Sequence, residues 1–190
     1  YNKFKKPLYI LTKSGKKVGM HLHDHSGKGY FNYRQLTKYK ILELKNLNLK
    51  KVIKINLKNK KQLGSDRIAN AIGAKKFKNC LVVDFGTATT FDVIKNSVYE
   101  GGVIAPGVNL SIKNLSKATA LLPTINLSLN QKKFGKNTIE ALNAGFVWGY
   151  EGLINNIINK IITKNKIKYK IIFTGGYANF FKKIIKKNVK

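Results

Sequence analysis

Hydrophobic residues follow strand-like patterns over much of the chain after residue 50. They partly alternate with polar residues over 52–57, which predicts a strand, and the unbroken run Leu81-Val82-Val83 predicts a buried central strand. Two further segments, at 91–94 and 98–104, flank an Asn96-Ser97 turn and are predicted to pair as antiparallel strands. We therefore expect three successive antiparallel strands, followed later by a buried strand at 170–173.

Apolar residues at helical spacing lie between and after these strands. Four helices are predicted, which begin at Ser65, at Pro106-Gly107, after Asn137-Thr138 and near Tyr177. Ser65 is expected to cap the first of them, which runs to about Lys76. Gly145, Gly149 and Gly152 lie inside the long third helix. Each glycine lowers helix stability by about 1 kcal/mol relative to alanine, so we expect close packing or a break in the helix there. Strands alternating with helices predict an α/β fold.

Residues 1–50 differ from the rest and are treated as an atypical segment before a unit at 51–190. Their periodicity is poor, apart from a short strand expected at 8–11. They contain all three histidines, His21, His23 and His25. His21 and His23 alternate, so both would project from one face of a strand and suit a divalent metal. A solvated loop without function is the alternative.

The chain of 190 residues carries 37 Lys and Arg against 8 Asp and Glu, a formal net charge of +29. Such charge attracts polyanions, so a basic nucleic-acid-binding module is one alternative. Only Arg34 and Arg67 are arginines, and the lysines are spread along the whole chain rather than clustered, which argues against specific nucleic-acid binding. The single cysteine, Cys80, fits a reducing cytoplasm. The chain shows no leader and no apolar run long enough to span a membrane, so no membrane partner is expected.

Four short segments carry candidate chemistry. Asp84 ends an apolar strand, and the small residues Gly86 and Thr87 follow at once, so backbone N–H groups can approach a phosphate while the carboxylate holds a cation. Asp66 and Arg67 stand at a helix start, which favours anions, and Asp66 can accept a proton from a hydroxyl. The other two segments are Thr174-Gly175-Gly176, at the end of a strand, and Gly135-Lys136-Asn137-Thr138, where Thr138 can cap the helix or contact a ligand. An ordinary turn or cap is the alternative at each.

In this order and spacing the segments resemble one family, the type III pantothenate kinases of the acetate and sugar kinase/Hsp70/actin superfamily. The resemblance covers residues 51–187 in six blocks, which lie at 63–71, 82–94, 101–107, 121–123, 135–138 and 174–178. It implies a ribonuclease-H-like, actin-like ATPase domain with a mixed sheet. It also implies ATP-dependent phosphorylation of pantothenate, the first step of coenzyme A synthesis, by a cytoplasmic homodimer.

The resemblance also implies roles for individual residues. Asp66 is similar to the proton acceptor, and Asp84 to the ligand of a monovalent cation, K⁺ or NH₄⁺. Mg²⁺ is expected beside ATP. The residues implied to bind pantothenate are Gly64, Ser65, Asp66, Arg67 and Thr138, and those implied to bind ATP are Thr87, Gly175 and Gly176.

The sequence departs from the family's pattern in two places. The Asp-x-Gly-Asn-Thr phosphate loop of the family's first strand is absent, and Leu57 stands where the family has a substrate-contacting tyrosine. We therefore expect a chain truncated at its N-terminus, with little or no kinase activity alone. A fusion, a frameshift or an assembly error would account for residues 1–50. An inactive homologue that binds ligands without turnover is a further alternative.

Overall fold

The computed structural model describes residues 9–11, 17–19, 52–129, 133–163 and 167–185. A two-stranded antiparallel pair, β1 (Tyr9–Leu11) and β2 (Lys17–Gly19), confirms the strand expected at 8–11. His21 and His23, the candidate metal ligands, and the third histidine, His25, lie outside the described residues. The division of the chain at residue 50 stays a prediction. None of the described helices is long and apolar enough to cross a membrane.

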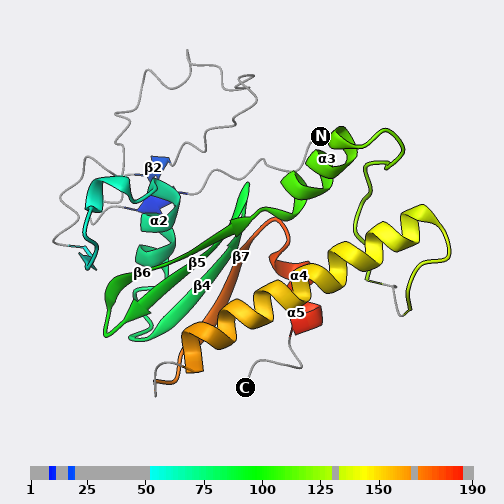
Figure 1. Ribbon diagram of the computed structural model, residues 1–190. Coiled ribbons are helices and arrows are strands. Elements are labelled where there is room, and N and C mark those ends of the chain that lie inside the picture. The colour runs from blue at the N-terminus through cyan, green and yellow to red at the C-terminus, as the bar shows by residue number, and fades with distance from the viewer. Residues whose placement is uncertain (1–8, 12–16, 20–51, 130–132, 164–166, 186–190) are drawn as a thin grey trace, which may run out of the picture.

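A five-stranded mixed sheet organises the rest of the described chain (Figure 1). Its strand order is β3 (Lys54–Ile55), β6 (Val98–Pro106), β5 (Ala88–Lys95), β4 (Cys80–Phe85) and β7 (Lys170–Gly175). The strands β4, β5 and β6 form the expected antiparallel series, while β7 runs parallel to β4 and β3 parallel to β6. The predicted α/β fold with a mixed sheet is confirmed.

The hairpin between β5 and β6 contains the expected turn and, beyond it, an irregularity. Asn96 and Ser97 both have positive φ angles, of 51° and 61°, as tight hairpin turns require. Further along, Val93 pairs with Gly101 but Ile94 pairs with Tyr99, so Glu100 is left over as a β-bulge. Because one extra residue reverses the alternation of side chains, Tyr99 lies on the same face of β6 as Gly102.

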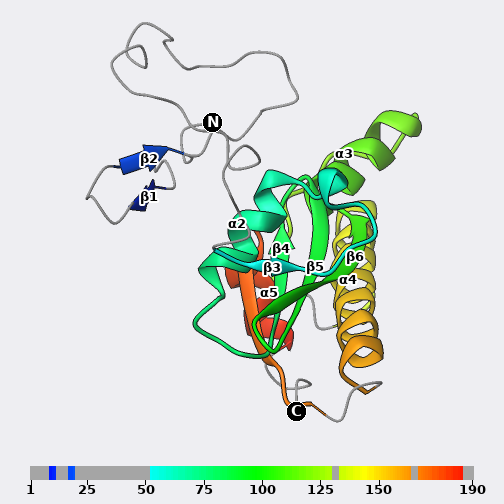
Figure 2. The same cartoon turned by 90° about the vertical axis from the view of Figure 1, so that its left-hand side faces the viewer.

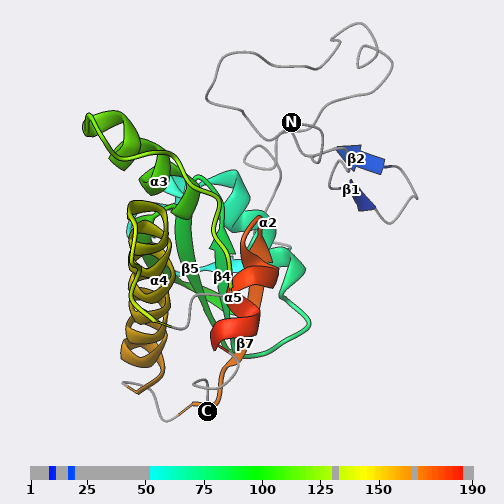
Figure 3. The same ribbon diagram turned by 90° about the vertical axis from the view of Figure 1, so that its right-hand side faces the viewer.

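Helices cover both faces of the sheet, in three layers (Figures 2 and 3). The helix α2 (Ser65–Gly73) covers one face. The helices α3 (Val108–Ala118), α4 (Thr138–Thr163) and α5 (Ala178–Ile185) lie on the other. A one-turn 3₁₀ helix, η3 (Lys60–Gln62), precedes α2.

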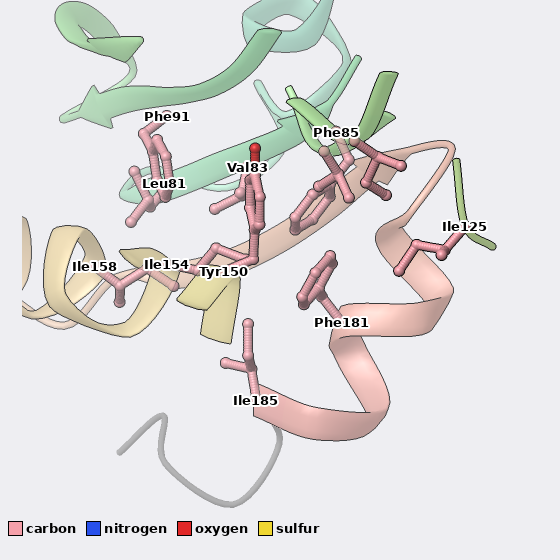
Figure 4. Close-up of a cluster of buried hydrophobic side chains, with 12 residues drawn as sticks. Leu81, Val83, Phe85, Phe91, Ile125, Tyr150, Ile154, Ile158, Phe181 and Ile185 are labelled. Carbon is pink, nitrogen blue, oxygen red and sulfur yellow. The ribbon is translucent and has the colours of Figure 1, made fainter. Parts of the chain in front are cut away.

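The two faces of the sheet pack differently because strand residues alternate. Toward α4 and α5 the side chains are apolar, and Figure 4 shows Phe181 and Tyr150 directed at the sheet residues Val83 and Phe85. The rings of Phe85 and Phe181 stack with centroids 5.2 Å apart. Toward α2 a smaller apolar cluster, including Val82 and Tyr99, is continued by polar residues. The core therefore lies mainly on one side, and the polar chemistry on the other.

Three local predictions need correction. Ser65 does not cap α2 but is its first residue, with Gly64 in the N-cap position, and α2 ends at Gly73 rather than near Lys76 because the chain turns there. The strand predicted over 52–57 is only two residues long, since β3 is an edge strand paired over just two positions of β6.

The long helix α4 shows no break at its glycines, since it is continuous through Gly145, Gly149 and Gly152. A Cβ added at any of the three would meet nothing within 4 Å. Neither a break nor close packing among the described residues accounts for these glycines. Its start is capped by Asn137, whose side chain accepts a hydrogen bond from the Glu140 N–H at 2.9 Å, and not by Thr138.

Candidate active site

Polar side chains form a row across the face of the sheet that α2 covers. Asp84 of β4 lies directly opposite Thr174 of β7 on one side and Thr90 of β5 on the other. Residues directly opposite in neighbouring strands share a face, so all three point toward the α2 side. Asp92 lies on the same face, two residues beyond Thr90. A continuous polar strip thus runs beneath α2.

Asp84 is held from above by α2. The side-chain amide of Asn70 donates a hydrogen bond to Asp84 Oδ2 at 2.8 Å. Burial raises the pKa of Asp84 above its ordinary value, the neighbouring Asp66 carboxylate raises it further, and the Asn70 hydrogen bond opposes both. The carboxylates of the first turn of α2 and of the end of β4 are therefore close enough to interact.

The other oxygen of Asp84, Oδ1, lies with the Phe85 carbonyl oxygen around the Cα of Gly175, and we call this arrangement the Gly175 cradle. Gly175 has a φ of +88°, and a Cβ there would lie 2.5 Å from Asp84 Oδ1 and 2.6 Å from the Phe85 carbonyl oxygen. Carboxylate and carbonyl oxygens are the ligands that hard cations prefer. Among the described residues no three His, Cys, Asp or Glu side chains gather as a metal site. The cradle therefore fits a hard cation bound with few protein ligands.

Asp66, the predicted proton acceptor, lies in the first turn of α2 and is exposed. Its carboxylate folds back over Gly64, where an added Cβ would collide with Asp66 Oδ1. Within the described part of the chain, Asp66 makes no hydrogen bond or ion pair. Its oxygens are thus open to a ligand approaching the helix start.

Arg67, by contrast, points into the protein. Its Nε donates to Asp92 Oδ1 at 2.7 Å, and the side chains are 14% and 0% exposed. The Tyr99 hydroxyl donates to the same oxygen at 2.8 Å, and the guanidinium carbon lies 5.9 Å from the centre of the Tyr99 ring. Burial raises the pKa of Asp92, and the charge of Arg67 opposes that rise. Removing one partner of such a buried pair typically costs about 3–5 kcal/mol.

Asp92 and Tyr99 belong to this polar face, although neither was predicted from the sequence as a site residue. The signal available was the lone carboxylate between Phe91 and Val93 in β5, because a buried charge needs a partner. The partner, Arg67, is 25 residues away in the sequence.

The predicted ATP-binding residues lie at one end of the sheet. Thr87 is exposed in the turn between β4 and β5, which the Gly86 N–H closes by donating to the Ala88 carbonyl at 3.0 Å. Gly176 follows β7, and its N–H donates to the Phe85 carbonyl at 3.0 Å. The structure thus brings Thr87, Gly175 and Gly176 to the end of β4, where Asp84 lies.

Thr138 and Leu57 are the exceptions. Thr138 is exposed at the start of α4, in the layer on the opposite side of the sheet from α2 (Figures 1 and 2). The chain therefore does not bring Thr138 to Asp66. Leu57 is half-buried and packs against the apolar cluster beneath α2.

Comparison with known proteins assigns the family. A family model described as type III pantothenate kinase matches residues 30–160. The chain belongs to the type III pantothenate kinase family. This confirms the resemblance seen in the sequence, and it does not favour the alternative of a nucleic-acid-binding module. The matched region begins inside the segment 1–50.

Individual relatives agree with the assignment. A type III pantothenate kinase of Pelagibacter ubique is 52% identical over 158 residues, which are 83% of this chain and 63% of that protein. Type III pantothenate kinase 1 of Francisella tularensis subsp. holarctica is 43% identical over 75% of this chain and 57% of its own length. The chain thus spans less than two thirds of the curated relatives it matches.

A solved structure also resembles this one. A crystal structure described as a conserved putative Baf family transcriptional activator from Campylobacter jejuni is 28% identical, with a TM-score of 0.53. The likeness covers 83% of this chain and 89% of that one. The arrangement of elements is therefore shared over most of both chains.

Proposed function

We propose that the polar face beneath α2 is the active site of an ATP-dependent pantothenate kinase, which makes 4′-phosphopantothenate in the first step of coenzyme A synthesis. One observation carries the proposal. An open carboxylate, Asp66, stands beside a second carboxylate, Asp84, at the strand end where the glycine turns converge. Membership of the family supplies the reaction class.

The chemistry requires a base and a place for phosphate charge. Asp66 accepts the proton of the pantothenate hydroxyl as that oxygen bonds to the γ-phosphorus of ATP. The bond from the γ-phosphorus to its bridging oxygen breaks, and ADP leaves. A positioned general base contributes about 10²–10⁴-fold in rate, and the remaining catalysis is positioning and charge stabilisation. The exposure of Asp66 suits this role, because the substrate must reach it from solvent.

Asp84, with the Gly175 cradle, would hold the monovalent cation, K⁺ or NH₄⁺. Thr87, Gly175 and Gly176 would contact ATP. The cation would offset phosphate charge next to these residues, and Mg²⁺ would travel with the ATP phosphates, as it does in sites that bind it partly through substrate. No residue of the described chain is assigned to Mg²⁺.

Pantothenate would lie along the start of α2, against Gly64, Ser65, Asp66 and the backbone of Arg67, whose guanidinium is paired with Asp92. The fifth predicted contact, Thr138, is on the other layer of the same chain. A second copy of the chain is the simplest way to supply it, so we propose a homodimer in which Thr138 of each copy approaches the other copy's site.

The surface around the start of α4 supports this dimer. Large apolar side chains are exposed there, among them Leu121 at 90%, Phe134 at 74% and Trp148 at 45%. Gly149, next to Trp148, has open space where a Cβ would be. Exposed apolar patches of this kind mark interfaces. Light scattering should find a dimer for the parent chain and a monomer for Trp148→Asp, while Ile104→Asp, a change on the α2 face of the sheet, should stay dimeric. A monomeric parent chain contradicts the proposal.

The function is tested by ATP- and K⁺-dependent phosphorylation of pantothenate. Two proteins are assayed. One is the 190-residue chain, and the other is that chain extended with the residues that precede the matched region in the Pelagibacter ubique relative. We expect turnover from the extended protein, a loss of about 10²–10⁴-fold in Asp66→Asn, and little turnover from the chain alone. Binding of pantothenate without turnover in both proteins would favour the inactive homologue.

A cytoplasmic location is part of the proposal. Its support is the buried free thiol of Cys80, since unpaired buried cysteines are ordinary in reducing compartments.

A further inference from the structure

We propose that Asp92 and Tyr99 form a buried anchor that holds Arg67, and through it positions helix α2 with the proton acceptor Asp66 over the end of β4. This assigns the Arg67 guanidinium to positioning rather than to substrate contact. The inference rests on the proposed function for the role of Asp66, but its structural part stands without it.

The first support is the geometry of the anchor. Asp92 is fully buried, and a single oxygen, Oδ1, receives both the Arg67 Nε–H at 2.7 Å and the Tyr99 hydroxyl at 2.8 Å. Two donors on one oxygen fix both the position and the direction of the guanidinium. The Tyr99 ring lies beside it, with the guanidinium carbon 5.9 Å from the ring centre.

The second support is that the sheet is shaped to admit the arginine. A Cβ on Gly102 would lie 2.6 Å from Arg67 Nη2 and would also collide with the Phe91 carbonyl oxygen. Glycine at 102 therefore leaves the space that Arg67 fills. The bulge at Glu100 brings Tyr99 onto the same face, where it can reach Asp92.

The third support is how the anchor connects to the catalytic carboxylates. Arg67 follows Asp66 directly, and one turn later Asn70 donates to Asp84 Oδ2 at 2.8 Å. The helix is thus attached to the sheet at two points, Arg67 on β5 and Asn70 on β4, with Asp66 next to the first. Arg67 Nη2 and Asp92 Oδ2 are buried without hydrogen-bond partners in the described structure. A buried charge pair with unused bonding capacity is costly, which points to a role beyond stability.

The test uses Tyr99→Phe, which removes one hydrogen bond and keeps the ring. Its matched control is Tyr169→Phe, because the Tyr169 hydroxyl is also buried but has no partner among the described residues. Two further variants change the ion pair itself. Asp92→Asn removes the negative charge, and Arg67→Lys replaces the planar guanidinium with an ammonium group.

Nuclear magnetic resonance of the full chain reads the anchor directly. The chain has only two arginines, so the Nε–H region holds two signals, and Arg34→Lys identifies that of Arg67. We expect the Arg67 Nε–H to exchange with solvent at least about tenfold faster in Tyr99→Phe and Asp92→Asn, together with the amides of α2. Tyr169→Phe should change neither. Unchanged exchange in Tyr99→Phe, or equal changes in the control, overturns the inference.

Kinetics of the extended protein separate positioning from substrate contact. Tyr99→Phe should lower kcat by about 10–100-fold with KM for pantothenate within twofold, since misplacing a base slows the chemical step. In an Asp66→Asn background, Tyr99→Phe should lower kcat no further, because the anchor acts through Asp66. A raised KM with unchanged kcat in Arg67→Lys would instead make Arg67 a substrate ligand and overturn the assignment. If no form turns over pantothenate, the proposed function fails, and the exchange measurements alone decide the inference.

Discussion

Replacing Gly175 by alanine is predicted to lower the free energy of unfolding, because the Gly175 cradle leaves no room for a methyl group. In Gly175→Ala the backbone keeps a φ of +88°, which costs an alanine about 1–2 kcal/mol. The added Cβ lies 2.5 Å from Asp84 Oδ1 and 2.6 Å from the Phe85 carbonyl oxygen, where ordinary contact begins at 3.4 Å. Overpacking of this kind costs about 1–3 kcal/mol. The two effects together predict a loss of about 2–5 kcal/mol.

The neighbours of Gly175 have little freedom to relieve these contacts. The Phe85 oxygen belongs to the inner strand β4 and accepts a hydrogen bond from the Gly176 N–H at 3.0 Å. Asp84 is held through its other oxygen by Asn70. We therefore expect the methyl group to displace the turn after β7 rather than the strand. That displacement would fill the space where the cation is proposed to bind.

The assay is urea unfolding followed by tryptophan fluorescence and circular dichroism. The matched control is Gly73→Ala in α2, where an added Cβ meets nothing within 4 Å and alanine is the better helix former. The control should gain up to about 1 kcal/mol. In an Asp84→Ala background, Gly175→Ala should cost about 1 kcal/mol less, since one of its two contacts is gone. Equal effects at positions 175 and 73 would refute the reasoning.

Three further outcomes follow from the same face of the sheet and its core. Because burial raises the pKa of Asp84, the folded chain holds that proton more tightly than the unfolded chain, and its contribution to stability falls as the pH rises above about 4. Asp84→Asn should thus unfold at higher urea than the parent at pH 7 and lose this difference near pH 4; a less stable variant at pH 7 would contradict it. Gly175→Ala should also abolish the K⁺-dependent rise in melting temperature, measured against Na⁺, and an undiminished rise would remove the cradle as the cation site. Burial raises the pKa of Cys80 to about 11, so a thiol reagent at pH 8 should label it only at the rate of unfolding, and immediate labelling of the folded chain would show an open site.

Local signals in the sequence were sufficient for the strand series. The Asn96-Ser97 turn and the strand-forming segments on either side of it predicted the hairpin of β5 and β6, and the positive φ angles of Asn96 and Ser97 agree with a tight turn there. Asp66, Asp84 and Gly175 were predicted as site residues from their places at strand and helix ends. The structure brings these three together, while their chemical roles remain predictions.

What escaped prediction depends on distant parts of the chain. The pairing of Arg67 with Asp92 joins an α2 side chain to a strand 25 residues later, and no local pattern encodes which strand face a helix will cover. The position of Thr138 is of the same kind. It starts a helix in the opposite layer, so its distance from Asp66 follows from the layer order and not from sequence spacing. The end of α2 at Gly73 was missed because apolar spacing continues beyond it.

The bulge at Glu100 makes this sheet sensitive to the length of the chain as well as to its chemistry. Inserting one residue between Tyr99 and Gly102, with the single bulge kept, would move Tyr99 from its place opposite Ile94 to a place opposite Lys95, and the alternation would then turn its side chain away from α2. The insertion would remove no residue of the anchor, yet it would separate Tyr99 from Asp92. Deleting Glu100 would instead leave Tyr99 two positions before Gly102, on the same face. Insertions in this hairpin are therefore expected to be tolerated in the Asn96-Ser97 turn and selected against between Tyr99 and Gly102.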